Sequence, residues 1–159
     1  MNKEALFVTM ALQAWETHIN RTEKLIQSLP EEQLLSEIAP GKNTGAYLVG
    51  HLVAIHDAMN TLLGTGERAY AHLDAAFVQN PDKSGLETPG IKELKQYWQN
   101  VHLSLSSAFK KMQPGEWFKK HNAISAEDFA TQPARNKLNV LINRTNHLAY
   151  HLGQLQLLK

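Results

Sequence analysis

The chain has 159 residues, of which 43% are apolar and 19% are charged, a composition typical of a folded globular protein rather than a disordered one. It carries 16 basic and 15 acidic residues, so the net charge of +1 gives no electrostatic reason to expect nucleic acid or an anionic membrane as a partner. It has no cysteine, which excludes disulfides, thiolate metal sites and cysteine nucleophiles. The length predicts a single domain covering residues 1–159.

The N-terminal stretch is not expected to be a targeting signal. Glu4, Glu16 and His18 interrupt it, and it lacks the apolar core and the small-residue cleavage site of a signal peptide. No uncharged apolar run is long enough to make a convincing membrane span. We therefore expect a cytoplasmic protein.

Two long helices are predicted in the first half of the chain. Residues 3–29 place apolar side chains at i, i+3, i+4 and i+7, and Pro30 ends the pattern. Residues 44–63 form a second helix that closes at Gly64. Asp57 is the only full charge in this second helix, which predicts that it is buried on more than one side.

Two further helices are predicted in the second half, over residues 91–112 and 134–158. The connection of residues 64–90 contains a short helical stretch at 69–78 and is longer than a normal turn between packed helices. It is long enough to cross a bundle, so the second and third helices can run parallel. No alternating strand pattern is present, and the sequence predicts an all-α four-helix bundle.

A pair of histidines lies in the apolar C-terminal stretch. His147 and His151 are four residues apart, which on a helix is about 40° of rotation and about 6 Å of rise, so both rings can reach one point. Two such rings can share a divalent cation, or they can be ordinary core histidines. Leu148 follows His147 where the metalloprotease motif H-E-x-x-H requires glutamate, so that motif is absent.

Other histidines offer a third ligand. His51 lies in the middle of the second helix, where a buried imidazole needs partners for both ring nitrogens. His56 is about 140° further round that helix and, together with Asp57, is interpreted as a helix flank or a subunit contact. His18 lies in the apolar stripe of the first helix. It is interpreted as a fourth ligand, a hydrogen-bond partner of a ligand, a proton carrier or a packed core residue. The remaining histidines are interpreted as surface or loop residues: His72, His102 and His121.

Two sequence stretches resemble the DinB/YfiT-like superfamily of bacterial proteins. They are YLVGHLVAIHD, at residues 47–57, and TNHLAYHLGQLQLL, at residues 145–158. The family pattern is a His-Leu pair in the second helix and H-x-x-x-H with a trailing Gly-Gln in the fourth, and the resemblance covers essentially the whole chain. It implies a four-helix bundle with up-down-down-up topology and a divalent metal held by His51, His147 and His151.

The resemblance also directs attention to residues around these ligands. Tyr47, one turn before His51, and Gln154, three residues after His151, are candidates for hydrogen-bond partners of the ligands or for pocket walls, as is His18. Gly50 and Gly153 lie beside or near ligands, where close helix approach, room for substrate or chance would each account for them.

The chemistry implied is that of an open metal site. Three imidazoles leave coordination positions free on Zn²⁺ or Ni²⁺, and the lack of thiolates leaves iron, manganese and cobalt open as well. The metal would lower the pKa of a bound water or deprotonate a thiol. No carboxylate is placed as a general base. Members resembling this family include thiol transferases, so we expect transfer of a low-molecular-weight thiol to a small electrophile.

Three alternatives to thiol transfer remain open, and one oligomeric state is expected. A metal-dependent hydrolase would turn over without thiol, and a non-catalytic module would use the metal only to hold helices together. The third alternative is a histidine core without metal. Residues 145–158 have no full charge, and the second helix is nearly as apolar, so a homodimer interface along these helices is expected.

Overall fold

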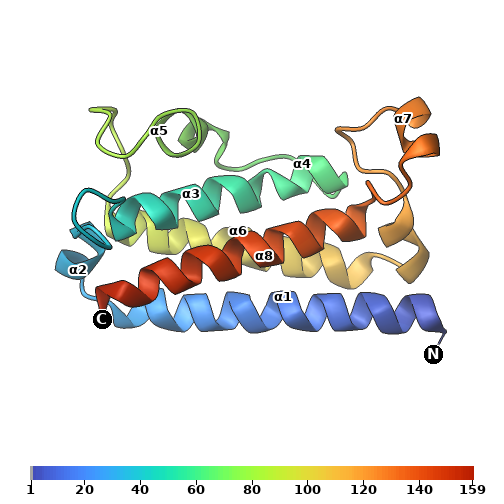
Figure 1. The fold of residues 1–159 in the computed structure, drawn as a ribbon, viewed down its shortest axis with the longest axis horizontal. Helices are drawn as coiled ribbons and strands as arrows, with labels where there is room; N and C mark the ends of the chain where they lie inside the picture. The colour runs from blue at the N-terminus through green and yellow to red at the C-terminus, as the bar shows by residue number, and fades with distance from the viewer. Residues whose placement is uncertain (1) are drawn as a thin grey trace.

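The computed structural model of the chain describes residues 2–159 and confirms the all-α class. Four longer helices lie side by side (Figure 1). They are α1 (Lys3–Ser28), α3 (Gly45–Asp57), α6 (Ile91–Lys111) and α8 (Lys137–Leu155). Shorter helices complete the fold: α2 (Glu31–Leu35), α4 (Met59–Leu63), α5 (Asp74–Phe77), α7 (Ala126–Thr131), η1 (Ala71–Leu73), η2 (Pro114–Phe118) and η3 (Gln156–Leu158). Within residues 2–159 the only β pairing is two isolated bridges.

The helix ends follow local sequence signals. α1 stops two residues before Pro30, and the Thr44 side chain caps α3 by accepting a hydrogen bond from the backbone N–H of Tyr47. Gly64 ends α4 with a φ of 68°, a left-handed conformation that glycine adopts without steric cost. The predicted second helix is interrupted at Ala58 and forms α3 and α4.

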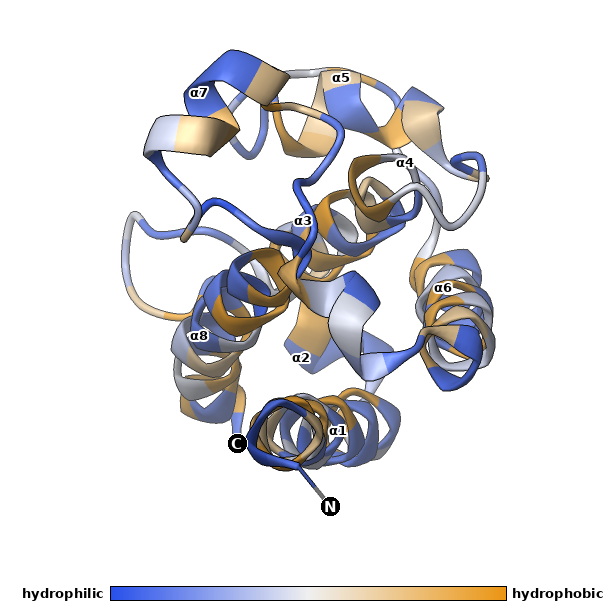
Figure 2. Cartoon of the chain, turned by 90° about the vertical axis from the view of Figure 1, so that its right-hand side faces the viewer, coloured by the Kyte–Doolittle hydropathy of each residue, from blue (hydrophilic) through white to orange (hydrophobic). Residues whose placement is uncertain are grey.

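The longer helices surround a shared apolar interior (Figure 2). α1 packs against α8, and α3 packs against both α6 and α8, whereas α1 and α6 touch little. Trp98, Leu52 and Leu141 are fully buried between them. No helix among residues 2–159 combines the length and apolarity needed to cross a membrane.

The connection between α4 and α6 is fastened to α3 by a buried carboxylate. Asp57 accepts hydrogen bonds from the backbone N–H groups of Ala69 and Tyr70, at 2.9 and 3.0 Å, and from Arg68 Nε at 3.2 Å. The two terminal nitrogens of Arg68 bind Asp74 at 2.6 Å each. Figure 1 shows the connection, with α5, lying over the outer side of α3 as a result. The interpretation of His56 and Asp57 as a helix flank is therefore wrong for Asp57, whose partners come from a segment that helical periodicity does not place.

Candidate metal centre

Three histidines from two helices converge on one point. His51 comes from α3, and His147 and His151 come from α8. His147 Nε2 lies 3.2 Å from His51 Nε2 and 3.1 Å from His151 Nε2. The three offer ligand atoms that all lie within 4.8 Å of one another, so this group can hold a metal ion. The structure thus brings together the three residues that the resemblance implied.

The spacing fits a cation of the first transition row. With metal–nitrogen distances of about 2.1 Å, nitrogens 3.1–3.2 Å apart subtend about 95–100° at the metal. This angle lies between the octahedral and tetrahedral values. All three residues are only partly buried, so the group is not sealed from solvent.

Two of the three rings are held in the tautomer that a metal needs. His51 Nδ1 lies 2.8 Å from the backbone oxygen of Phe77, and His151 Nδ1 lies 2.6 Å from Gln154 Oε1. Both oxygens only accept hydrogen bonds, so each Nδ1 carries the proton and each Nε2 presents a lone pair. Outer partners of this kind are typical of metal-binding histidines. Gln154 is thus hydrogen-bonded to one of the three histidines, which is one of the two positions considered for it from the sequence.

The converging lone pairs are suited to holding a cation. His147 Nε2 can donate one proton to only one of the two lone pairs beside it. Burial lowers the pKa of His147 to about 4, with smaller contributions from His151 and His51. Burial likewise lowers the pKa of His151, although its bond to Gln154 acts in the opposite direction. Near pH 7 these two rings are therefore neutral, which is the form that binds metal.

Gly50 allows the connection to reach His51. A Cβ atom on Gly50 would lie 2.3 Å from the nearest ring carbon of Phe77, so only glycine lets this ring pack against α3. The Phe77 backbone oxygen then lies within hydrogen-bonding distance of His51. A Cβ atom on Gly153 would meet nothing within 4 Å. Close approach of the Phe77 ring thus accounts for glycine at position 50, and no close approach accounts for glycine at position 153.

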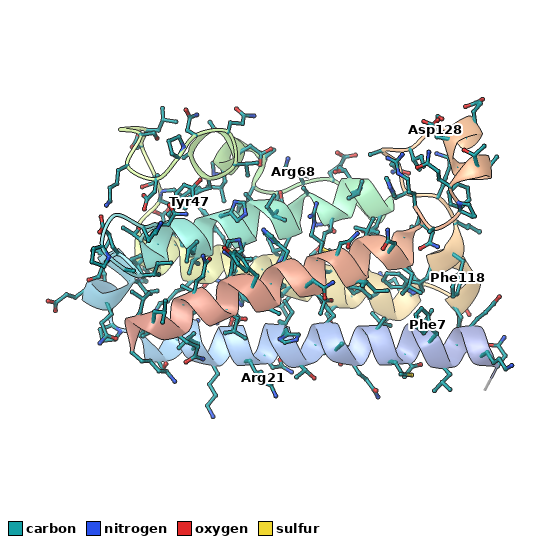
Figure 3. The ribbon with its side chains drawn as sticks, viewed as in Figure 1. Phe7, Arg21, Tyr47, Arg68, Phe118 and Asp128 are labelled. Atoms are coloured by element: carbon teal, nitrogen blue, oxygen red, sulfur yellow. The ribbon has the colours of Figure 1, made fainter. Side chains whose placement is uncertain are left out.

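Tyr47 packs beside His51. Its ring stacks on His51, with centroids 6.4 Å apart and planes 9° apart, and its hydroxyl donates to the backbone oxygen of Asn80. Figure 3 shows Tyr47 and Arg68 along the side of α3 that faces the connection. A cavity of about 520 Å³ lies beside Tyr47 and Phe77, between the start of α3 and the end of the connection. Two residues that contact His51 therefore also line a space large enough for a small molecule.

His18 is not part of the metal-binding group. It lies on α1, and its Nδ1 is buried without a hydrogen-bond partner among the described residues. The structure therefore gives no support to His18 as a fourth ligand.

A second histidine pair was not predicted. His56 is fully buried, and its Nδ1 lies 2.8 Å from Nε2 of His102, whose own Nδ1 lies 2.7 Å from the backbone oxygen of Trp98. Trp15 packs edge-on against His56, with ring centroids 4.9 Å apart. The interpretations of His56 as a flank and His102 as a surface residue are therefore wrong. The available signals were the almost uncharged second helix, and the position of His102 one turn after Trp98 and beside Val101 of the apolar stripe.

A model of a known protein family matches most of the chain. The family model described as the DinB superfamily matches residues 14–155, a range that includes all three histidines of the candidate metal centre. No curated protein matches the chain.

Proposed function

The chain belongs to the DinB superfamily, since that family's model matches most of its length, and we propose that it is a divalent-metal-dependent enzyme that transfers a low-molecular-weight thiol to a small electrophile. The observation that carries this proposal is the convergence of three imidazole Nε2 atoms. Two of these atoms present lone pairs, because the Nδ1 atoms of the same rings donate to carbonyl oxygens. Zn²⁺ and Ni²⁺ suit this all-nitrogen set best, and iron, manganese and cobalt are the other candidates.

Each protein group has a separate part in this proposal. His51, His147 and His151 would hold the cation, which when bound supplies the Lewis acidity that lowers the pKa of a thiol or a water. Tyr47 would limit the space beside His51, and the neighbouring cavity would accept the electrophile. The outer acceptors, Gln154 and the Phe77 carbonyl, would keep the rings aimed at the metal.

Hydrolysis is the second candidate function, and a purely structural metal is the third. Among residues 2–159 no carboxylate is hydrogen-bonded to any of the three histidines, so the site has no evident general base to activate water. A thiol is far more acidic than water before any cation binds it, so it depends less on such a base, which favours thiol transfer. A structural site is normally closed by four protein ligands, whereas this group has three.

The proposal includes the arrangement of the helices and the assembly of the protein. We propose the up-down-down-up bundle topology, supported by the long connection that runs back over α3 between α4 and α6. We also propose a homodimer in the cytoplasm. Its interface would include Tyr150 and Leu157, large side chains that are 64% and 63% exposed in the C-terminal region. A monomeric mass at micromolar concentration would count against the dimer.

The decisive experiment measures metal content and thiol dependence together. Tag-free protein and the His147→Ala variant would be compared by mass spectrometry of their metals. We expect about one metal per chain in the wild type and none in the variant. The loaded protein should then conjugate thiols to electrophiles, and chelation should stop the reaction. Full activity without metal would refute the proposal, and turnover that needs metal but no thiol would favour the hydrolase.

A further inference from the structure

One half-buried arginine has no anionic partner in the chain. Arg144 lies on α8, and its Nε atom is buried without a hydrogen-bond partner within residues 2–159. Every ion pair among the described residues involves Arg68 or Lys83, so Arg144 takes part in none. A guanidinium group stays protonated in proteins, and a charge that leaves water normally has a partner. The charge of Arg144 is therefore unbalanced in the structure.

The other half-buried arginine, Arg68, is fully paired. Its two terminal nitrogens bind Asp74 at 2.6 Å each, and its Nε binds Asp57 at 3.2 Å. The hydrogen bond to Asp74 is the largest cause that raises the pKa of Arg68, whereas burial lowers the pKa of Arg144 and no partner opposes it. The chain thus supplies carboxylates to one of these arginines and leaves the other for a group from outside.

Helix geometry places Arg144 beside the candidate metal centre. Arg144, His147 and His151 occupy positions i, i+3 and i+7 of α8, which lie on one side of a helix. Residues at i and i+3 have their Cβ atoms about 5–6 Å apart. The charge of Arg144 is also one of the smaller causes that lower the pKa of His147. The side of α8 that carries two candidate ligands therefore carries the unpaired cation as well.

The end of the Arg144 side chain keeps contact with solvent. Its Nε is one of the buried atoms without a partner, but its two terminal nitrogens are not among those buried atoms. These nitrogens also make no hydrogen bond within the part of the chain that the structure describes, so solvent is what they contact. A guanidinium group presents two parallel N–H donors that match the two oxygens of a carboxylate. An anion that arrives from solvent can therefore pair with Arg144.

We infer that Arg144 selects an anionic substrate: its guanidinium binds a carboxylate of the molecule that reacts at His51, His147 and His151. The inference rests on the proposed function and names the substrate class for that same site. Because Arg144 is one helical turn from His147, the carboxylate lies within a few bonds of the reacting atom. It belongs to the thiol or to the electrophile, and the experiment separates these two sources.

The thiol is tested by binding to the Co²⁺-loaded protein. The probes are 3-mercaptopropionate and 3-mercapto-1-propanol, which have the same chain length and differ in charge, and the Co²⁺–thiolate absorption band reports binding. If the thiol carries the carboxylate, the wild type binds the acid about 10–100-fold more tightly than the alcohol, and Arg144→Gln loses this preference. Arg135→Gln is the matched control, because Arg135 is an exposed arginine just before α8, and it should keep the preference.

The electrophile is tested by turnover with the uncharged thiol, 3-mercapto-1-propanol. The probes are iodoacetate and iodoacetamide, which have nearly the same size, and the rate of the metal-free protein is subtracted. If the electrophile carries the carboxylate, Arg144→Gln raises KM for iodoacetate about 10–100-fold and leaves KM for iodoacetamide unchanged. An Arg144→Gln variant that matches the wild type in both the thiol and the electrophile measurements would overturn the inference.

A stability measurement tests a purely structural role of Arg144. Methionine keeps most of the apolar stem and removes the charge, so Arg144→Met should not lower the urea midpoint of the metal-free protein. Arg68→Met breaks two ion pairs and should lower that midpoint. Equal losses in both variants would show that Arg144 has an anionic partner of its own in solution, such as a second copy of the chain, and would overturn the inference.

Failure of the inference can be distinguished from failure of the proposed function. A wild type that binds no Co²⁺ would refute the proposed metal site itself. A wild type that binds Co²⁺ and thiol, but shows no dependence on Arg144 for either charged probe, would refute only the substrate class. The Arg144→Gln variant should bind Co²⁺ with the wild-type spectrum, because Arg144 is not one of the three histidines that can hold the cation.

Discussion

Replacing Gly50 with alanine tests whether packing of the connection supports the metal centre. The new Cβ atom would lie 2.3, 2.5 and 2.6 Å from three ring carbons of Phe77, whereas carbon atoms in contact are about 3.5 Å apart. The ring must therefore move by about 1.2 Å, and because the ring is buried we expect the backbone of Phe77 to move with it. Its carbonyl is 2.8 Å from His51 Nδ1, so a shift of this size lengthens or breaks that bond.

The expected cost divides between stability and metal affinity. Overpacking costs about 1–3 kcal/mol, and alanine in a helix regains about 1 kcal/mol over glycine, so the apo protein should lose about 0–2 kcal/mol of unfolding free energy. Loss of the outer partner of His51 should weaken metal binding about 10–100-fold, which corresponds to about 1.4–2.7 kcal/mol. The assays are urea denaturation of the apo protein and chelator competition.

Gly153 provides the matched control within the same site. It also lies in a helix close to a candidate ligand, but its added Cβ atom would meet nothing within 4 Å. Gly153→Ala should therefore raise stability by about 1 kcal/mol and leave metal affinity unchanged. If Gly50→Ala gave the same stabilisation and the same affinity as Gly153→Ala, the role assigned to the Phe77 contact would be refuted.

Three further outcomes are expected. Zn²⁺ at about 100 times its dissociation constant should raise the unfolding free energy by about 2.7 kcal/mol, and His151→Ala should abolish this gain in thermal melts; a gain that survives the substitution would place the metal elsewhere. Burial lowers the pKa of His102 to about 3 from 6.5, and that of His56 also falls far below 6.5, so protons bind the unfolded chain more tightly. The contribution of these two histidines to the unfolding free energy should be fully present above pH 6.5. It should fall by up to about 1.4 kcal/mol per pH unit and per histidine as the pH decreases toward 3. His102→Asn should flatten this slope in urea titrations, and an unchanged slope would contradict burial of His102 as its cause. Asp57→Asn weakens the acceptor of Ala69 and Tyr70, while Arg68 keeps its two bonds to Asp74, and should cost about 1–3 kcal/mol by urea denaturation. Lys83→Met removes an exposed ion pair and should cost much less; equal costs would contradict the role of the buried carboxylate.

Local sequence signals predicted the helices because each signal acts within a few residues. Pro30, the Thr44 cap and Gly64 stand at or beside the ends of helices that the apolar periodicity had indicated. The predicted first helix, residues 3–29, differs from α1 by one residue. The i, i+4 spacing of His147 and His151 likewise indicated that both rings could reach one point, and the structure places them together.

Contacts between distant segments were not predictable in this way. His56 and His102 are 46 residues apart, and nothing in either helix alone identifies the other as its partner. The ion pair between Asp57 and Arg68 forms only because the connection returns over α3. Phe77 acts through its main-chain oxygen, an atom that every residue has, so no residue type could have marked it.

The main-chain oxygen that accepts the hydrogen bond of His51 Nδ1 therefore cannot be removed by a side-chain substitution. No single substitution at position 77 deletes a main-chain carbonyl, so natural variation or a mutagenesis library at that position changes only what packs against Gly50. Metal binding should instead be sensitive to substitution of the residues that position this main chain, chiefly Gly50 and the pair Asp57–Arg68. A saturation scan scored on metal binding should therefore show intolerance at these residues, although their side chains do not contact the three histidines.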